Sequence, residues 1–197
     1  YEEAAAQGLL GGINAAKHIL NMPHLTLSRD SSYLGVMVDD LITSHLNEPY
    51  RMFTSRAEHR LFLRPDNVYT RLFHLASSFN LLSPSQKMRQ KKYLDLCVKI
   101  KKFVSLNSSP DKKPLSKLIK RPEESLLKYI KDKSLLLNRD FLDVVFEVET
   151  SIKYAGYIEN EKERISKNIQ LEHLQIPFDV DYNKIQGLSS ESKERLL

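Results

Sequence analysis

An arginine cluster without lysine is the most unusual chemical feature of this 197-residue sequence. Five of the eleven arginines fall within residues 51–71, although lysine is the commoner cation in the whole chain. They are Arg51, Arg56, Arg60, Arg64 and Arg71. A guanidinium group is planar and always charged, so it can bind a phosphate through two parallel hydrogen bonds. Tyr50, Phe53 and His59 lie among these arginines, and the mixture indicates an anion-binding or nucleic-acid-binding surface.

The same arginines could serve structure alone, since acidic residues lie beside them. Glu48, Glu58 and Asp66 are close enough in sequence to hold some of the five in ion pairs. A purely structural helical module with every arginine paired is therefore an alternative. Removing a paired arginine would leave a carboxylate without its partner and lower stability, which distinguishes the two readings.

A second basic stretch covers residues 87–102, with seven lysines and arginines against Asp95 alone. On a helix these cations spread around much of the circumference, because successive residues are about 100° apart. The apolar stripe of that helix would consist of Leu94, Cys97, Val98 and Phe103. The pattern favours a solvated, lysine-rich face, and non-specific attraction of phosphate is the alternative.

No motif predicts a catalytic residue or a metal site. The histidines follow no metal-ligand spacing: His18, His24, His45, His59, His74 and His173. The single cysteine, Cys97, excludes an internal disulfide and a cysteine-based zinc site, and its apolar neighbours predict a buried side chain. Asp39 and Asp40 are adjacent, so on a helix their side chains diverge. We expect this pair to be capping, ion-paired or exposed and not to share an ion.

Helical periodicity governs the elements that must position these residues. The composition, 41% hydrophobic and 28% charged with a net charge of +5, is ordinary for a globular protein. The apolar spacing predicts helices over residues 2–20, 33–46, 69–80, 84–106 and 141–170, with short ones at 122–130 and 134–138. Residues 50–63 would suit a strand or a buried helix, and residues 107–114 form a linker. The fold class is therefore mainly α.

Three further patterns concern the first and last helices. Gly8, Gly11 and Gly12 lie inside the first helix, where they make no dinucleotide-binding turn and favour close packing against another layer. The 141–170 helix presents one apolar face: Val145, Val148, Ile152, Ile158, Ile165 and Ile169. We expect that face to be packed and Glu161, Lys162 and Lys167 to lie in water.

Both ends of the chain look like parts of longer elements. Good helix formers begin at the first residue, with Glu2 and Glu3 in the first turn. Residues 187–189 (GLS) predict a turn and a helix N-cap only a few residues from the end. We interpret the sequence as an interior piece of a longer protein.

Five strings carry a resemblance to a known family. They are YEEAAAQGLLGGINAA, YLGVMVDDL, EPYRMFTSRAEHRLFLRPDN, IKYAGYIENE and IPFDVDYNKIQGLSSESKERL. In order and spacing they resemble the glucose-inhibited division protein A family, most firmly over residues 1–67 and 147–197. Residues 101–140 look divergent, and His59 stands where many relatives carry tyrosine.

The resemblance implies three segments. Residues 1–22 would be the terminal helix of an FAD-binding domain, and residues 23–82 a connector that carries the arginine motif. Residues 83–197 would be a helical C-terminal domain, incomplete at its end. The Gly-rich FAD loop and the catalytic cysteines of the family precede this stretch, so the resemblance implies no catalytic residue here.

The resemblance also implies an activity. Members of the family are FAD-dependent enzymes that add a carboxymethylaminomethyl group to C5 of the tRNA wobble uridine. They use methylenetetrahydrofolate and NADH, with glycine or ammonium as the source of the amine. They act in the cytoplasm as homodimers that form a heterotetramer with a partner GTPase.

Site residues follow by the same likeness. The backbone of Tyr1, Glu2 and Glu3 would face the flavin. Arg51, Arg60 and Arg64 match arginines that hold tRNA, and Arg56 of the same cluster is assigned with them. A non-catalytic, basic RNA-binding relative is the second alternative.

Overall fold

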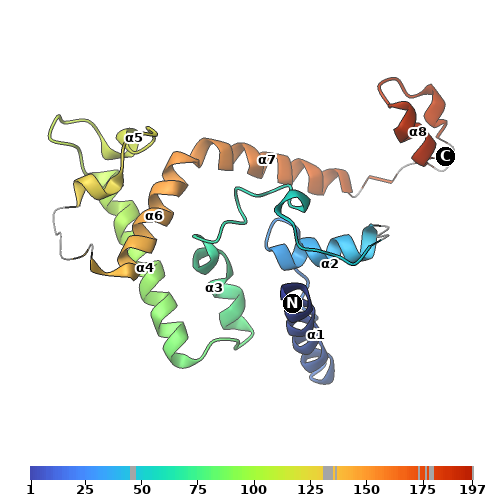
Figure 1. The fold of residues 1–197 in the computed structure, drawn as a ribbon, viewed down its shortest axis with the longest axis horizontal. Helices are drawn as coiled ribbons and strands as arrows, with labels where there is room; N and C mark the ends of the chain where they lie inside the picture. Colours follow the sequence, from blue (N-terminus) through green and yellow to red (C-terminus); the bar gives the residue numbers. More distant parts are fainter. Residues whose placement is uncertain are drawn as a thin grey trace. The chain divides into compact units, whose positions relative to one another are not determined.

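The computed structural model describes residues 1–44, 48–130, 135, 137–172, 174–175, 177 and 180–196. The chain divides into two compact units, residues 1–161 and 162–197. The α-helices are α1 (Glu2–Ile19), α2 (Tyr33–Thr43), α3 (Val68–Ser78), α4 (Pro84–Leu106), α5 (Leu115–Leu118), α6 (Arg139–Lys153), α7 (Ala155–Glu172) and α8 (Ser190–Leu196) (Figure 1). Short 3₁₀ helices are η1 (Thr54–Arg56), η2 (Leu126–Tyr129) and η4 (Tyr182–Lys184). The described residues form no β-strand, and the predicted mainly α class is confirmed.

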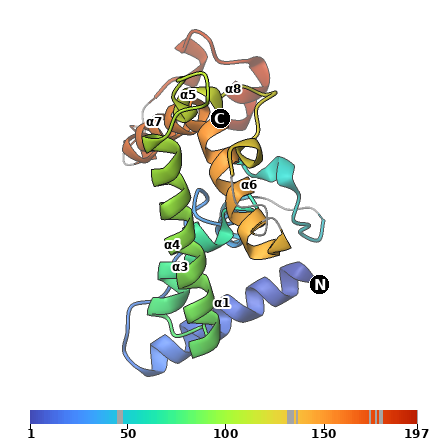
Figure 2. The ribbon, with the colours of Figure 1, turned by 90° about the vertical axis from the view of Figure 1, so that its left-hand side faces the viewer.

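The larger of two hydrophobic cores in the first unit lies between α4, α5, η2 and α6, and α4 runs beside α6 (Figure 2). Pro84 occupies the first turn of α4, and Ser83 caps it, accepting a hydrogen bond from the Gln86 N–H while the Gln86 side chain bonds the Ser83 N–H. This start and the end at Leu106 are as predicted.

The predicted apolar stripe of α4 is only partly correct. The buried residues are Tyr93, Cys97, Ile100 and Val104, at the i, i+4, i+7, i+11 spacing of one helix face. Of the residues expected there, Val98 is 66% exposed and Phe103 is 36% exposed, while Leu94 is half-buried. The expected set mixed two faces, because apolar residues occur on both sides of this helix and only packing against α6 decides between them.

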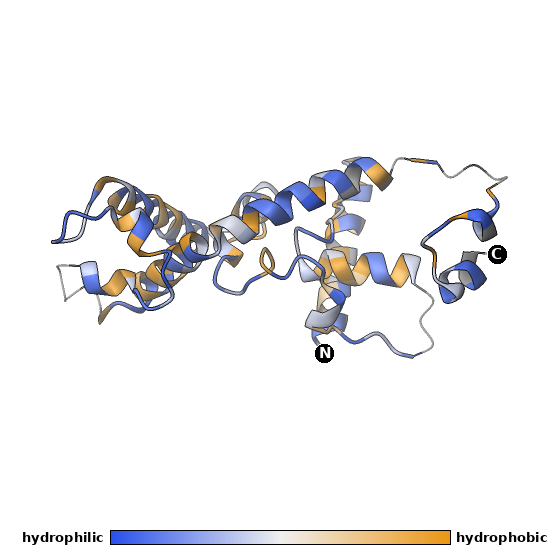
Figure 3. Ribbon diagram, turned by 90° about the horizontal axis from the view of Figure 1, so that it is seen from above, coloured by the Kyte–Doolittle hydropathy of each residue, from blue (hydrophilic) through white to orange (hydrophobic). Residues whose placement is uncertain are grey.

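The helix predicted over residues 141–170 is two helices. It breaks at Tyr154, whose N–H still bonds the Thr150 carbonyl, and α7 begins at the next residue. Gly156, a poor helix former, follows directly. The apolar face is buried at Val145 and Val148 and half-buried at Ile152, Ile158 and Ile165; the Ile169 side chain lies outside the described residues. Most of α7 is hydrophilic (Figure 3).

The predictions for the remaining segments are only partly correct. Residues 50–63 form neither a strand nor an α-helix: they are an irregular loop around η1, followed by turns. Within 122–130 only the 3₁₀ turn η2 is helical, and α5 was not predicted. Helix α2 ends at Thr43, and its predicted end at Leu46 lies outside the described residues, as do residues 134 and 136 of the 134–138 segment.

The second unit holds most of α7, together with η4 and α8. Gly187 adopts a φ of +95°, a left-handed conformation that glycine accepts without strain. The Ser189 hydroxyl then accepts a hydrogen bond from the Ser192 N–H at 3.1 Å and caps α8. The turn and the cap predicted at residues 187–189 are confirmed.

Candidate functional site

Arg29 is the hub of the arginine-bearing loop, residues 50–63. One guanidinium nitrogen donates to Asp39 at 2.8 Å and to Asp40 at 2.6 Å. The other donates to Glu58 at 2.7 Å and to the Arg56 carbonyl at 2.9 Å. The adjacent aspartates therefore share one cation, contrary to expectation, because a long side chain from another segment enters between their diverging carboxylates.

The ion pairs of Arg29 favour the charged forms of Arg29 and Glu58. Burial alone would lower the pKa of Arg29, but its three carboxylate partners outweigh burial and raise that pKa. Burial would likewise raise the pKa of Glu58, yet Arg29 holds it below the usual value. Arg29 was missed at the sequence level, although two aspartates without a cation on their own helix were a signal that one must come from elsewhere.

Helix α2 approaches the Arg29 turn very closely. Ser32 caps this helix by accepting a hydrogen bond from the Gly35 N–H at 3.0 Å. A Cβ atom at Gly35 would collide with the Ser28 carbonyl oxygen, so only glycine allows this approach. The approach places Arg29 within reach of both aspartates of α2.

Arg56 belongs to the same network. The Tyr50 hydroxyl donates to Asp40 at 3.0 Å, and the Arg56 guanidinium lies over the Tyr50 ring, 4.9 Å from its centroid. Arg56 also reaches Asp40 at 3.8 Å. Burial and the Asp40 carboxylate raise the pKa of Tyr50 to about 12. Arg56 is thereby half-buried and engaged within the protein.

Arg64 and Arg71 hold the end of the loop. Arg64 binds the Asp66 carboxylate at 3.1 Å and donates to the Leu61 carbonyl at 2.7 Å. Arg71 donates to the Ser31 carbonyl, which ties α3 to the start of α2. The ion pair expected from Asp66 is therefore present, whereas Glu58 pairs with Arg29, which lies outside the cluster.

Arg51 and Arg60 differ from the other arginines of the loop. Both are exposed, and no acidic side chain in the described part of the chain lies within ion-pair distance of either. Arg51 stacks on the exposed ring of Phe53, with 5.3 Å between the guanidinium carbon and the ring centroid. These two cations are available to an anion from outside.

The first turn of α1 is attached to the same loop. A Glu3 carboxylate oxygen accepts a hydrogen bond from the Met52 N–H at 2.9 Å, and this bond lowers the pKa of Glu3. Tyr1 and Glu2 are exposed. The structure thus brings the residues expected to face a flavin next to the arginine loop, with the Glu3 side chain used internally.

His59 joins the loop to α7. Its Nδ1 lies 2.7 Å from a carboxylate oxygen of Glu161, and both side chains are largely buried. Glu161 was expected in water, and that expectation is wrong: the loop covers it. Lys162 and Lys167 are exposed, as expected.

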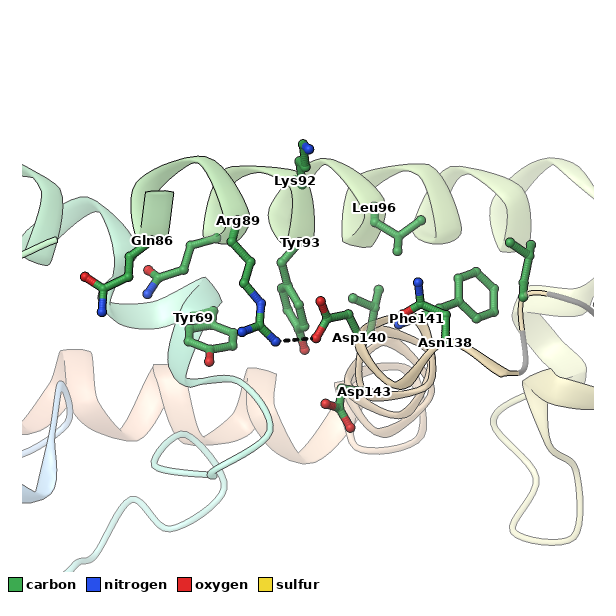
Figure 4. A pocket seen from close by; sticks show the side chains of 13 residues that line it. Tyr69, Gln86, Arg89, Lys92, Tyr93, Leu96, Asn138, Asp140, Phe141 and Asp143 are labelled. Carbon is green, nitrogen blue, oxygen red and sulfur yellow. Dashed lines mark hydrogen bonds and ion pairs between the residues drawn. The ribbon is translucent and has the colours of Figure 1, made fainter. Parts of the chain in front are cut away.

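Helix α4 carries the second basic stretch, and all seven of its cations are exposed. Arg89 pairs with Asp140 at 2.6 Å beside a cavity of about 520 Å³ between α3, α4 and α6 (Figure 4). Tyr69 and Tyr93 meet edge to face in the wall of this cavity, 5.1 Å apart. The exposure of these cations fits the solvated-face interpretation.

Glu147 lies behind that cavity and is 2% exposed. Its carboxylate accepts a hydrogen bond from Thr70 of α3 and lies 3.7 Å from the Cys97 Sγ. Burial and the nearby Glu147 raise the pKa of Cys97 to about 12, so this thiol stays protonated and unreactive near neutral pH. The predicted burial of Cys97 is confirmed.

The described residues hold neither a metal-ion site nor a membrane-spanning helix. No group of three or more His, Cys, Asp or Glu side chains there is placed to hold a metal ion; His45 and His173 lie outside them. No helix in the same residues combines the length and apolar character needed to span a bilayer.

No family model matches the chain. Over its whole length it is 38% identical to the tRNA uridine 5-carboxymethylaminomethyl modification enzyme MnmG of Protochlamydia amoebophila, and 43% identical to the enzyme of that name from Chlamydia trachomatis serovar D. The form II crystal structure of Aquifex aeolicus GidA superposes with a TM-score of 0.72 at 38% identity, again over the whole chain. The predicted resemblance to the glucose-inhibited division protein A family is confirmed.

The matches cover all of this chain but only part of each relative. The chain covers 32% and 33% of the two curated relatives and 33% of the GidA chain, so it spans about a third of their length. The arginine loop lies inside the matched part, since all 197 residues are covered. The form I crystal structure of GidA gives the same TM-score at 39% identity.

Proposed function

We propose that this chain is the tRNA-holding part of a flavin-dependent enzyme that adds a carboxymethylaminomethyl group to C5 of the tRNA wobble uridine. The observation that carries the proposal is a pair of exposed arginines without acidic partners among the described residues, Arg51 and Arg60, on a loop that Arg29 holds through ion pairs to Asp40 and Glu58. Support also comes from relatives named as tRNA uridine modification enzymes at about 40% identity.

In this proposal the arginines divide the work. Arg51 and Arg60 contact tRNA phosphates, because each offers an uncommitted fork of N–H donors. Arg56 and Arg64 position the loop through Asp40 and Asp66. Phosphate contacts of this kind fix the register of the RNA without reading its sequence. The uridine would then be selected by other parts of the enzyme.

A flavin would meet this chain only at the start of α1. The first backbone N–H groups of a helix have no partner within it, and with the helix dipole they favour negative charge. The backbone of Tyr1, Glu2 and Glu3 fits that task, while the Glu3 carboxylate is held by Met52. When bound, FAD would supply the redox chemistry, with NADH and methylenetetrahydrofolate as co-substrates.

The proposal includes the assembly implied by the family. The segments 1–22, 23–82 and 83–197 would serve as the last helix of the FAD-binding domain, the arginine connector and the helical C-terminal domain. The whole enzyme would be a cytoplasmic homodimer that binds a partner GTPase in a heterotetramer. A non-catalytic RNA-binding relative is the alternative, and tRNA modification by the intact protein separates the two.

The test compares tRNA affinity with thermal stability in the intact protein as made in the cell. Replacing Arg51 or Arg60 by alanine should weaken tRNA binding about tenfold at an unchanged melting temperature. The slope of log K against log salt should flatten by somewhat under one unit for each replacement. Lys91→Ala on the solvated face of α4 is the matched control and should change neither quantity.

Arg64→Ala provides the internal contrast. Because it frees a half-buried Asp66, it should lower the melting temperature, and any loss of tRNA affinity should follow the loss of folded protein. A parent-like salt slope in both Arg51→Ala and Arg60→Ala would reject the tRNA-holding role and leave the structural reading.

A further inference from the structure

Phe53 is a large apolar side chain left 47% exposed on an otherwise anchored loop. The residue before it is fixed through its N–H to Glu3, and the residues after it form η1. The Arg56 carbonyl at the end of η1 accepts from Arg29. The exposed ring is therefore held in place by its neighbours and not by a contact that buries it.

The loop contains two arginine–aromatic pairs, and the pair of Arg56 with Tyr50 is engaged within the protein. Arg56 lies over Tyr50, the Tyr50 hydroxyl is bonded to Asp40, and Arg56 itself reaches that carboxylate. Arg51 likewise lies over Phe53, but both residues are exposed, and the pair has no carboxylate among the described contacts. Only the Arg51–Phe53 pair is open to an outside ligand.

We propose that Phe53 and Arg51 form a nucleotide site, in which an unpaired RNA base stacks on the Phe53 ring and an adjacent phosphate binds Arg51. This inference rests on the proposed tRNA function and names the part of the RNA that the loop holds. A planar apolar face beside an uncommitted guanidinium matches a nucleotide, which carries a π face and an anion a few ångströms apart.

The site requires a base whose face is free. In a duplex every base is stacked between its neighbours, whereas loop bases can be splayed out onto an aromatic side chain. The pair should therefore distinguish a hairpin with an unpaired loop from a fully paired RNA of equal charge. Phosphate attraction alone, as at Arg60, makes no such distinction.

The experiment measures affinities of the intact protein for two RNA probes, an anticodon stem-loop and a fully paired duplex of the same length. Phe53→Ala should weaken binding of the stem-loop at least about fivefold, as expected for one lost base–aromatic stack, and should leave duplex binding unchanged. Phe53→Tyr keeps the ring and should bind like the parent. Phe53→Leu keeps apolar bulk without a ring and should behave like the alanine variant.

Salt dependence and a remote control complete the design. Phe53→Ala should leave the slope of log K against log salt unchanged, while Arg51→Ala should flatten it, since only the second removes a phosphate contact. Phe146→Ala, at a phenylalanine of α6 that is 63% exposed, should leave both affinities unchanged.

The outcomes separate the two proposals. A parent protein that binds neither probe would overturn the tRNA function and this site with it. Stem-loop binding by the parent, with equal affinity in Phe53→Ala and Phe53→Leu, would overturn the stacking site alone. An equal loss for stem-loop and duplex would also overturn it, because a stack needs an unpaired base.

Discussion

The arginines in and around the loop have different roles, which depend on whether a carboxylate of the same chain neutralises them. Arg29, Arg56 and Arg64 are half-buried, and each meets at least one carboxylate of the same chain. Arg51 and Arg60 are exposed and meet none within the described residues, so they can take an outside anion without breaking an internal ion pair. The ion-paired arginines hold the loop in its conformation, and the exposed ones are accessible to an anionic ligand.

Arg29→Lys tests the hub directly. A lysine ammonium is a point charge and cannot reach Asp40, Glu58 and the Arg56 carbonyl at once. We expect the variant to lose about 2 kcal/mol of unfolding free energy, because half-buried acceptors are left unpaired. Urea denaturation of the intact protein would measure it.

The control for this change is another arginine with an ion pair. Arg89→Lys alters the exposed contact with Asp140, and it should leave the urea midpoint unchanged. Equal midpoints for Arg29→Lys and the parent would show that the network does not hold the loop.

At the scale of elements, local signals predicted where helices begin and end. Ser83 and Pro84 marked the start of α4, and residues 187–189 marked the cap of α8. The loop 50–63 was not predictable, because Arg29 and Glu3 hold it from positions distant in sequence. The aromatic and apolar residues of this loop imitate a strand pattern, but none of them is paired with another strand.

The candidate site was predictable in composition and not in geometry. The arginine cluster was evident from residue types alone, but the split between Arg51 and Arg64 depends on which acids fold back onto the loop. Asp66 is two residues from Arg64 and was recognised as a partner. His59 and Glu161 are 102 residues apart, and no local pattern links them.

The stability of the contact between α6 and η2 should depend on pH. Glu149 accepts from Lys153 at 2.7 Å, from the Leu126 N–H at 2.8 Å and from Ser125 at 3.0 Å. Burial would raise the pKa of Glu149, but these three donors outweigh it and hold the pKa below the ordinary 4.5. A lowered folded-state pKa means that the stabilisation is present above about pH 4.5 and is lost as pH falls through the folded-state value.

Glu149→Gln should therefore destabilise the protein at pH 7 by about 1 kcal/mol, and the difference from the parent should shrink as pH falls below about 4. Melting temperatures across this range would measure it. Glu123→Gln, at an exposed position in the same region, should follow the parent at every pH. A difference between Glu149→Gln and the parent that stayed constant with pH would exclude an ionic contribution.

At the scale of the whole molecule, helix α1 stands apart from the hydrophobic core. The larger hydrophobic core lies in α4, α5, η2 and α6 and a smaller one joins α2 to the loop, whereas α1 has no buried residue. A side chain added at Gly8, Gly11 or Gly12 would meet open space within this chain. Helix α1 is attached to the rest through a few polar contacts, such as Asn14 with the Leu25 backbone at 2.6 and 3.0 Å.

This distribution predicts that the 197 residues by themselves bind no flavin. A flavin dinucleotide needs a glycine-rich turn between a strand and a helix, where backbone N–H groups hold its pyrophosphate. The described residues contain no strand, and the glycines of α1 lie within the helix and not before it. One helix N-terminus gives too few contacts to retain FAD through desalting.

The purified 197-residue chain should therefore show no visible flavin absorption, while a flavoprotein handled in the same way keeps its colour. Stoichiometric flavin in the chain would mean that α1 and the arginine loop already form a complete cofactor site, and Glu3→Ala, which frees the Met52 N–H, would then be the first variant to lose it.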